Sequence, residues 1–490
     1  MIRLHSDYAS LPGSFHAPMA PLPVPRPRLF ALNAELADRL GLNFSSGSEA
    51  ELADLFSGNA VPDGARPVAM AYAGHQFGNF VPQLGDGRAV LLGELRDAEG
   101  QLVDVHLKGA GATPFSRGGD GRSALGPVIR EYLVSEAMHA LGVPTTRSLA
   151  AVTTGEVVHR EEPKPGGILA RLARSHVRVG TFQYFAARRD LESLQRLVDH
   201  VIERLYPEAA GAERPVEAML TAVVEAQARL VARWLSLGFV HGVMNTDNMS
   251  IAGETIDYGP CAFMEAFDPA AVWSSIDRRG RYAYSNQPPI AQWNLARLAE
   301  TLLPLIDPDN EAAAIERATD LLQRFAPAFE AAWLDGMRAK LGLVRPGDDD
   351  GALIQGLLDA MHAAEADFTL TFRHLADVAE DAGDAEGFRA AMKRPDALDG
   401  WLVQWRARLA SEQRDPGDVA EGLRAVNPAL VPRNHRVEAA IRAAEDQNDF
   451  SVFERLHEAW KRPFAPRPED ADLMRPAAVE ERVTVTFCGT

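Results

Sequence analysis

Hydrophobic and polar positions alternate between residues 68 and 108 in a pattern that predicts short β-strands joined by tight turns. Residues 89–95 read as a strand, and residues 102–108 place Val103, Val105 and Leu107 on one face. A period of two residues is typical of a strand with one buried face and one polar face. We therefore predict two antiparallel hairpins, the second ending in a half-buried strand whose polar face carries Lys108.

Helical periodicity replaces this pattern further along the chain. Pro127 suits the first position of a helix that runs to Leu141. Apolar residues at helical spacing predict a longer helix over 216–237, and Gly238 ends it. We expect residues 249–257 to form a short hairpin, and most of the second half of the chain to be helical.

Composition and charge narrow the classes of function. The 490 residues include 50 Lys and Arg against 68 Asp and Glu, a formal net charge of −18. Such a chain is a poor electrostatic partner for nucleic acid or an anionic membrane, so we expect neither as a partner. It shows no apolar run of about 20 residues, the length of a membrane helix, and no secretory signal. We expect a cytoplasmic monomer.

Five features follow one another in the order in which protein kinases carry the parts of their active site. A hairpin with glycines is followed by the strand with Lys108, a helix with Glu131, a loop that begins at His241, and Asp257-Tyr-Gly. Each feature alone has an ordinary explanation, and Glu131 alone reads as an exposed helical glutamate. The complete order predicts a protein-kinase-like two-lobed fold with the active site in the cleft between the lobes.

This order divides the predicted α+β protein into three sections. Residues 1–60 would form a proline-rich arm, extended along the surface, and a first helix. Residues 61–180 would form a β-rich lobe with the nucleotide-binding hairpins, the lysine strand and the glutamate helix. Residues 181–490 would form a larger, mostly helical lobe with the catalytic loop, the metal-binding aspartate and the C-terminal tail.

The loop from His241 departs from the kinase pattern at one position. His241 and Asn248 keep the kinase spacing of histidine and asparagine. Asn248 alone reads as a turn or capping residue and Asp257 as a strand-end residue, but as a pair they offer two hard oxygen ligands for Mg²⁺. Val243 occupies the place of the kinase catalytic aspartate and cannot accept a proton, whereas Asp247 stands one residue before Asn248.

Longer runs of residues give a specific resemblance. The chain resembles the selenoprotein O family, also called the YdiU family, in Tyr72-Ala-Gly-His-Gln-Phe-Gly-Asn-Phe, Gln83-Leu-Gly-Asp-Gly-Arg, His106-Leu-Lys-Gly-Ala-Gly and the run from His241 to Asn248. That family is described as pseudokinases that bind ATP in a flipped orientation and transfer AMP to protein hydroxyl groups. The resemblance implies ATP as co-substrate, Mg²⁺ or Mn²⁺ as cofactor, and proteins with Ser, Thr or Tyr hydroxyls as partners.

The resemblance also implies a role for each matching position. Lys108 and Glu131 would form the ion pair that holds the lysine against phosphates, and Asp247 would accept the proton. Asn248 and Asp257 would hold the metal. The remaining ATP-binding positions would be Gly85, Gly87, Arg88, Asp120, Gly121, Arg171 and Arg178. From spacing alone, Arg171 and Arg178 read equally well as solvated charges two turns apart on one helix.

The two cysteines leave two interpretations open. Eukaryotic members of the family carry selenocysteine third from the end, where this chain has Cys488, and Cys261 follows Asp257-Tyr-Gly-Pro. They would be either unrelated reduced thiols, the usual state in a cytoplasm, or a reversible redox pair that ties the tail to the cleft.

Three functions compete at this point. The first is the transfer of AMP from ATP to Ser, Thr or Tyr hydroxyls of proteins with release of pyrophosphate. The second is a non-catalytic nucleotide-binding module, which Val243 supports and Asp247 opposes. The third is an ordinary phosphotransferase, which the missing kinase aspartate opposes.

Overall fold

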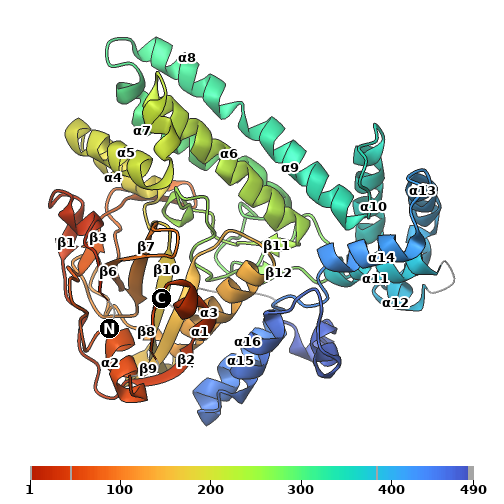
Figure 1. Cartoon of the computed structure of the whole chain (residues 1–490), viewed down its shortest axis with the longest axis horizontal. Coiled ribbons are helices and arrows are strands. Elements are labelled where there is room, and N and C mark those ends of the chain that lie inside the picture. Colours follow the sequence, from red (N-terminus) through yellow and green to blue (C-terminus); the bar gives the residue numbers. More distant parts are fainter. Residues whose placement is uncertain (1–2, 45–46, 382–384, 484–490) are drawn as a thin grey trace.

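The fold combines an antiparallel sheet with a larger set of helices, as the computed structural model in Figure 1 shows. The structure describes residues 3–44, 47–381 and 385–483. This composition confirms a mixed helix-and-sheet protein with an antiparallel sheet. The kinase-like two-lobed arrangement and the three section boundaries stay predictions.

The main sheet contains both strands predicted from the alternating pattern. Its order is β1 (His16–Pro18), β3 (Val68–Met70), β6 (Ala89–Arg96), β7 (Leu102–Lys108), β10 (Pro163–Ala173), β9 (Arg147–His159) and β2 (Arg28–Leu32), with β8 (Ser123–Ala124) beside β10. Each neighbouring pair is antiparallel. A separate hairpin joins β4 (Gly74–Gln76) to β5 (Asn79–Val81).

The N-terminal arm is extended, as predicted, but it is more than a surface segment. It supplies β1, which pairs with β3, and it leads into β2, which pairs with β9. Phe15 and Val24 within the arm are buried. The arm therefore contributes to both edges of the sheet and to its core.

The prediction of a half-buried β7 with a polar face was wrong in one respect. Asp104 and His106, on that polar face, are 2% and 0% exposed. Asp104 pairs with Arg204 and His176, and His106 pairs with Asp86. The alternation is real, but its polar side faces an internal network and not water.

The predicted helix after residue 127 is α3 (Leu125–Ala140), which begins two residues before Pro127. It lies on β9 and β10, and its other side packs against α15 (Asn434–Gln447) and α16 (Ser451–Trp460) from the far end of the sequence. Because both sides are covered, nearly all of α3 is buried, including Glu131. Glu131 is therefore not the exposed helical glutamate of the simpler interpretation.

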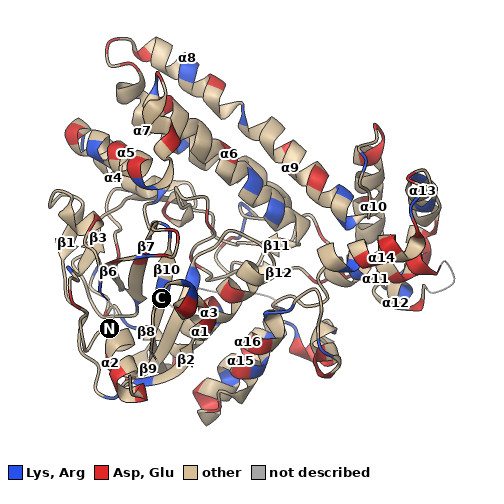
Figure 2. Cartoon of the chain, viewed as in Figure 1, with Lys and Arg blue, Asp and Glu red and all other residues tan. Residues whose placement is uncertain are grey.

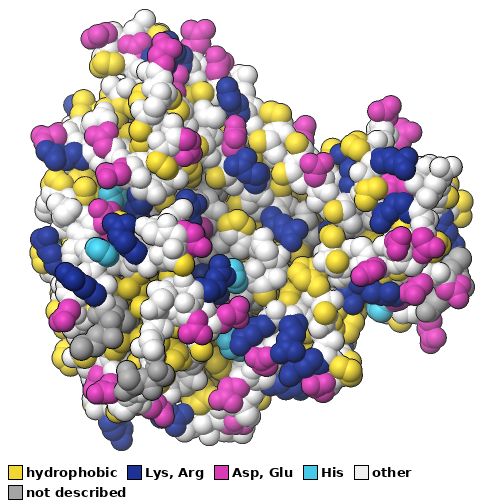
Figure 3. All heavy atoms as spheres, in the orientation of Figure 1, with side chains coloured by type: hydrophobic (Ala, Val, Ile, Leu, Met, Phe, Trp, Pro, Cys, Tyr) yellow, Lys and Arg dark blue, Asp and Glu magenta, His cyan; other side chains and the backbone are white. Residues whose placement is uncertain are grey.

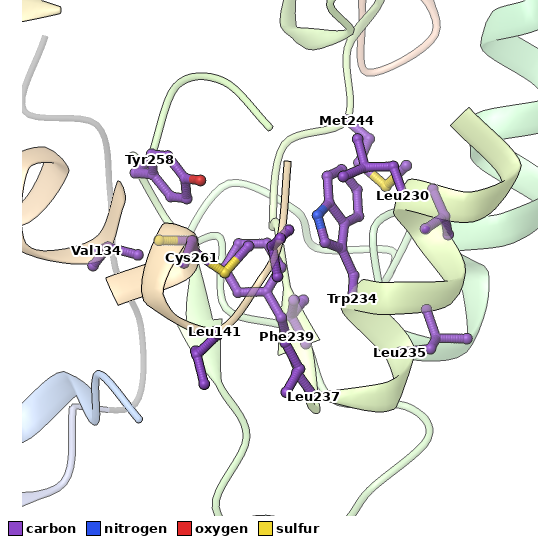
Figure 4. Packing of buried hydrophobic residues seen from close by; sticks show 14 of the residues in the cluster. Val134, Leu141, Leu230, Trp234, Leu235, Leu237, Phe239, Met244, Tyr258 and Cys261 are labelled. Carbon is purple, nitrogen blue, oxygen red and sulfur yellow. The ribbon is translucent and has the colours of Figure 1, made fainter. Parts of the chain in front are cut away.

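The long apolar stripe forms α6 (Pro215–Ser236), and Gly238 follows it with φ +68°. Helices α7 (Gln287–Ile306), α8 (Glu311–Leu322) and α9 (Phe325–Lys340) pack against α6. Near its C-terminal end, Trp234 and Leu235 join Phe239 and Leu141 in the core (Figure 4). The other helices are α1 (Ala34–Arg39), α2 (Glu49–Ser57), α4 (Val179–Ala187), α5 (Leu191–Leu205), α10 (Asp350–Ala364), α11 (Phe368–Glu380), α12 (Glu386–Ala390), α13 (Asp399–Ala410) and α14 (Pro416–Val426).

The predicted hairpin over 249–257 does not form. Its two sides bridge to other segments, Ser250 to Arg178 and Thr255 to Thr145. The ladder that does form joins β11 (Phe239–Val240) to β12 (Ala262–Phe263). These two short strands hold the base of the loop that carries Asp247, Asn248 and Asp257. In the described part of the chain, the structure has no helix with the length and apolar character needed to cross a membrane.

Candidate active site

Three cationic side chains converge on the carboxylate of Asp257. Lys108 Nζ lies 2.6 Å and Arg171 Nη1 2.7 Å from its Oδ1, and Arg178 Nη1 lies 2.9 Å from its Oδ2. Burial alone would raise the pKa of Asp257, but these cations hold it well below its usual range. Charges of both signs are mixed along the helices (Figure 2) and over the face drawn in Figure 3, so this concentration of cations is a local feature.

The pairing of β7 with β10 brings two of these cations together. Arg171 in β10 lies opposite His106 in β7, two residues from Lys108. Arg178 precedes α4 and lies over the ring of Tyr72, with 4.6 Å between its guanidinium carbon and the ring centroid. The alternative of two solvated arginines on one helix is therefore wrong, because one lies in a strand and the other in a loop.

The predicted ion pair between Lys108 and Glu131 is present. Lys108 Nζ donates to Glu131 Oε2 at 2.6 Å, and Arg171 Nη1 donates to Glu131 Oε1 at 3.0 Å. Burial alone would raise the pKa of Glu131, but Lys108 and Arg171 lower it. Glu131 thus holds two of the three cations from the helix side, while Asp257 holds them from the loop side.

Asp247 lies in a short 3₁₀ turn, Thr246–Asn248, and is 7% exposed. Gln76 Nε2 donates to its Oδ2 at 3.3 Å, and its Oδ1 has no hydrogen-bond partner among the described residues. Burial raises the pKa of Asp247 to about 6. A buried carboxylate with one unused oxygen is suited to accept a proton from a bound group.

The β4–β5 hairpin covers this turn. His75 N donates to Thr246 Oγ1 at 2.7 Å, and Phe77 N donates to Asn245 Oδ1 at 3.0 Å. A Cβ at Gly74 would lie 2.4 Å from Asp247 Oδ1, so only glycine lets the hairpin approach the carboxylate this closely. Sequence analysis missed Gln76 as a partner of Asp247, although it lies within the run that begins at Tyr72.

Asn248 keeps the structural role that its simpler interpretation gave it. Its Nδ2 donates to Val243 O at 3.0 Å, which leaves the amide oxygen as the atom for a cation. Among the described residues, no three His, Cys, Asp or Glu side chains gather as metal ligands. An ionised Asp257 and the Asn248 oxygen are hard donors that fit Mg²⁺ only if phosphates or water complete its shell.

The predicted glycine positions have strong steric reasons. Gly85 has φ +76°, and a Cβ there would lie 2.3 Å from the ring of Phe115. Gly121 has φ +63°, and its Cβ would lie 2.1 Å from Gly111 O. A Cβ at Gly87 would lie 3.0 Å from Phe115 O. Gly85 therefore makes room for the Phe115 ring and Gly121 brings two backbone segments together, whereas a Cβ at Gly87 would be a tight fit that a small shift could accommodate.

Two charged residues near these glycines differ in their surroundings. Arg88 is half-buried, and its Nη1 has no hydrogen-bond partner among the described residues. Asp120 forms an ion pair with Arg160 at 2.9 Å, and 45% of its side chain is exposed. Arg88 thus keeps a buried donor without a partner among the described residues, whereas Asp120 already has a cationic partner.

Cys261 is buried in the core beside Tyr258 (Figure 4). Cys488, its partner in the redox-pair interpretation, lies outside the described residues. Both interpretations of the two cysteines therefore stay open.

Comparisons with known proteins agree over nearly the whole chain. A family model described as protein adenylyltransferase SelO matches residues 2–461. A protein nucleotidyltransferase YdiU from Bradyrhizobium sp. (strain ORS 278) is 57% identical over 485 residues, which cover 99% of this chain and 98% of the relative. Another, from Rhizobium meliloti (strain 1021), is 56% identical over 488 residues, which cover 100% of this chain and 99% of the relative.

The class that these findings define is that of the nucleotidyltransferases. The match over so much of the chain then fixes the family: the chain belongs to the SelO family. This confirms the resemblance seen in its sequence motifs.

Proposed function

We propose that the protein transfers AMP from ATP to Ser, Thr or Tyr hydroxyls of other proteins and releases pyrophosphate, on a kinase-like two-lobed fold. The observation that carries the proposal is the convergence of Lys108, Arg171 and Arg178 on Asp257. A polyanionic ligand is stabilised by such preorganised donors.

The chemistry assigns a role to each charged group. The acceptor hydroxyl oxygen attacks the α-phosphorus of ATP and forms a new P–O bond. The bond from that phosphorus to the bridging oxygen of the β-phosphate breaks, and pyrophosphate leaves with the electron pair. Asp247 takes the hydroxyl proton, and the three cations stabilise the charge that develops on the leaving pyrophosphate.

The other predicted positions complete the proposed site. Asn248 and Asp257 would hold Mg²⁺ or Mn²⁺, which when bound would neutralise phosphate charge. Backbone at the three glycines, with Arg88, would line the nucleotide, and Asp120 would do so from its ion pair with Arg160.

A second candidate function is a non-catalytic nucleotide-binding module. Val243, which is buried and cannot accept a proton, favours it because it stands where kinases carry their base. The buried Asp247 with its unused oxygen favours catalysis. The two candidates differ in whether any acceptor gains mass.

Intact-mass measurement after incubation with ATP, Mg²⁺ and an acceptor protein tests the proposal. We expect a gain of about 329 Da, an adenylyl group, at a hydroxyl side chain. A gain of about 80 Da would mean phosphoryl transfer instead. ATP binding without a mass gain on any acceptor would support the non-catalytic module.

Two variants sharpen the test. Asp247→Asn should remove the gain while ATP binding survives, because the proton acceptor is needed for transfer and not for holding the nucleotide. Asp309→Asn, which changes an exposed aspartate on a loop before α8, is the matched control and should leave the gain intact. Full activity of Asp247→Asn would remove Asp247 from the mechanism.

A further inference from the structure

Two buried residues outside the predicted site lie directly behind its arginines. Asp86 stands between Gly85 and Gly87, and His106 lies two residues before Lys108 on β7. Asp86 is 3% and His106 0% exposed. Burying a carboxylate and an imidazole is costly unless each is fully hydrogen-bonded, so their partners indicate what they do.

His106 joins Asp86 to Arg171. Its Nε2 lies 3.0 Å from Asp86 Oδ2, and its Nδ1 lies 3.1 Å from Arg171 Nη2. Asp86 Oδ2 also accepts from Met70 N at 3.1 Å, and Asp86 Oδ1 lies 3.9 Å from Arg178 Nη2. The pair thus contacts both arginines on the sides that face away from Asp257.

The partners of His106 determine its proton. An arginine has no acceptor, so Nδ1 must be the lone-pair nitrogen that accepts from Arg171, and Nε2 must carry the hydrogen that Asp86 accepts. Burial lowers the pKa of His106, which agrees with a neutral ring. Arg171 is then fixed at both terminal nitrogens, with Nη1 on Glu131 and Asp257 and Nη2 on His106.

The turn that holds Asp86 is itself fixed. Thr113 Oγ1 donates to Asp86 O at 2.6 Å, and Ser116 Oγ donates to Gly87 O. A glycine-rich turn would otherwise be among the most flexible parts of a chain. The Asp86 side chain therefore connects a fixed turn to the arginines.

We propose that Asp86 and His106 are positioning residues that hold Arg171 and Arg178 in the geometry that binds the phosphates. This inference rests on the proposed function, because it needs the arginines to contact the nucleotide. It assigns Asp86 and His106 no contact with ATP. Their loss should therefore weaken recognition of the triphosphate and of pyrophosphate, and leave recognition of the nucleoside unchanged.

A matched pair of histidines provides the experiment. His176 is equally buried and stacks on His106, with 4.3 Å between the ring centroids. Its Nδ1 hydrogen-bonds Asp104, and its Nε2 has no hydrogen-bond partner in the described part of the chain, so its ring is hydrogen-bonded to neither arginine there. His106→Phe keeps an aromatic ring of similar shape and removes both hydrogen bonds. His176→Phe makes the same change one layer away. Affinities for ATP, inorganic pyrophosphate and adenosine are measured by calorimetry for both variants and the unchanged protein.

We expect His106→Phe to weaken ATP and pyrophosphate binding on the order of tenfold, the usual effect of losing one hydrogen bond to a charged group, with adenosine binding unchanged. His106→Asn, which keeps an acceptor near the Nδ1 position, should recover most of the loss. His176→Phe should leave all three affinities unchanged.

Equal losses in the two Phe variants, or an equal loss for adenosine, would overturn the inference, because either marks a general loosening of the fold. If the unchanged protein binds neither ATP nor pyrophosphate, the proposed function fails. If it binds both, and His106→Phe binds them with the same affinity, only this inference fails. Should His106→Phe not fold in thermal unfolding, Asp86→Asn takes its place. Its amide oxygen can still accept from His106 Nε2–H and Met70 N–H, but its NH2 group then faces Arg178 without the negative charge, so it should produce the same selective loss.

Discussion

The ion pair between Lys108 and Glu131 offers the sharpest quantitative prediction. Lys108→Met and Glu131→Gln each remove one charge and keep most of the side-chain volume. The pair is short, with 2.6 Å between Nζ and Oε2, and the side chains are 14% and 4% exposed. Both single variants should reduce kcat/KM for ATP. Lys108→Met should reduce it more, because the lysine contacts phosphate in the proposed site whereas the glutamate only orients it.

The remaining ion pairs limit the size of the coupling between Lys108 and Glu131. Removing one partner of a buried pair costs about 3–5 kcal/mol when the other charge is left uncompensated. Here neither is, because Arg171 remains 3.0 Å from Glu131 and Asp257 remains 2.6 Å from Lys108. The coupling should therefore lie lower, at about 1–3 kcal/mol, or about 5- to 150-fold in kcat/KM.

The assay is AMP transfer from ATP labelled on the α-phosphate, with the two single variants and the double variant. The double variant should lose less than the sum of the two single losses. Lys393 and Glu365 form a surface pair with the same 2.6 Å N–O distance, 62% and 45% exposed, and Lys393→Met with Glu365→Gln should leave kcat/KM unchanged. Additivity of the Lys108 and Glu131 losses within about 0.5 kcal/mol would refute the coupling.

Two other changes test the balance of buried charge. Asp257→Asn should abolish AMP transfer, and unaltered transfer would contradict the role of Asp257. Because the variant leaves the three cations short of one negative charge, added pyrophosphate should raise its melting temperature more than that of the unchanged protein. Burial, with Arg233 nearby, lowers the pKa of Lys340 from 10.5 to about 7. Because the unfolded chain holds this proton more tightly, the shift reduces the free energy of unfolding by up to about 4–5 kcal/mol at neutral pH, and this penalty disappears as pH rises toward 10.5. Lys340→Met should therefore be more stable in urea at pH 7, and its advantage should shrink at pH 9.5; an advantage independent of pH would contradict the buried charge.

Local patterns predicted the elements whose physics is local. The alternation at 102–108 and the helical stripe at 216–237 agree with β7 and α6 within a residue or two. Hydrophobic period and the residues that end an element depend on neighbours in sequence, so one sequence is enough to locate them. The hairpin at 249–257 failed because its polar and apolar residues satisfy partners elsewhere, such as Thr145 for Thr255. Short segments without a strong period are decided by long-range pairing, which one sequence does not display.

The buried polar layer formed by Asp86, Asp104 and His106 is the part of the site that the sequence pattern did not predict. Alternation identifies a polar face, but it does not distinguish water from an internal network, so Asp104 and His106 read as solvent-facing residues although both are buried. Only their positions in the sequence indicated that these residues belong near the site: Asp86 lies between two predicted glycines, and His106 lies two residues before the predicted lysine.

Charge balance gives the buried polar layer its role in the proposed binding of phosphates. Lys108, Arg171 and Arg178 are matched by the carboxylates of Glu131, Asp257 and Asp86 before any ligand arrives. In the proposed function, a polyanion would therefore not enter an uncompensated positive pocket; it would exchange with carboxylate contacts that already exist. Exchange costs little reorganisation when the cations stay in place as their partners change. Glu131 and the pair Asp86–His106 hold Arg171 from behind, which leaves Asp257, on the loop side, as the contact that phosphates would replace.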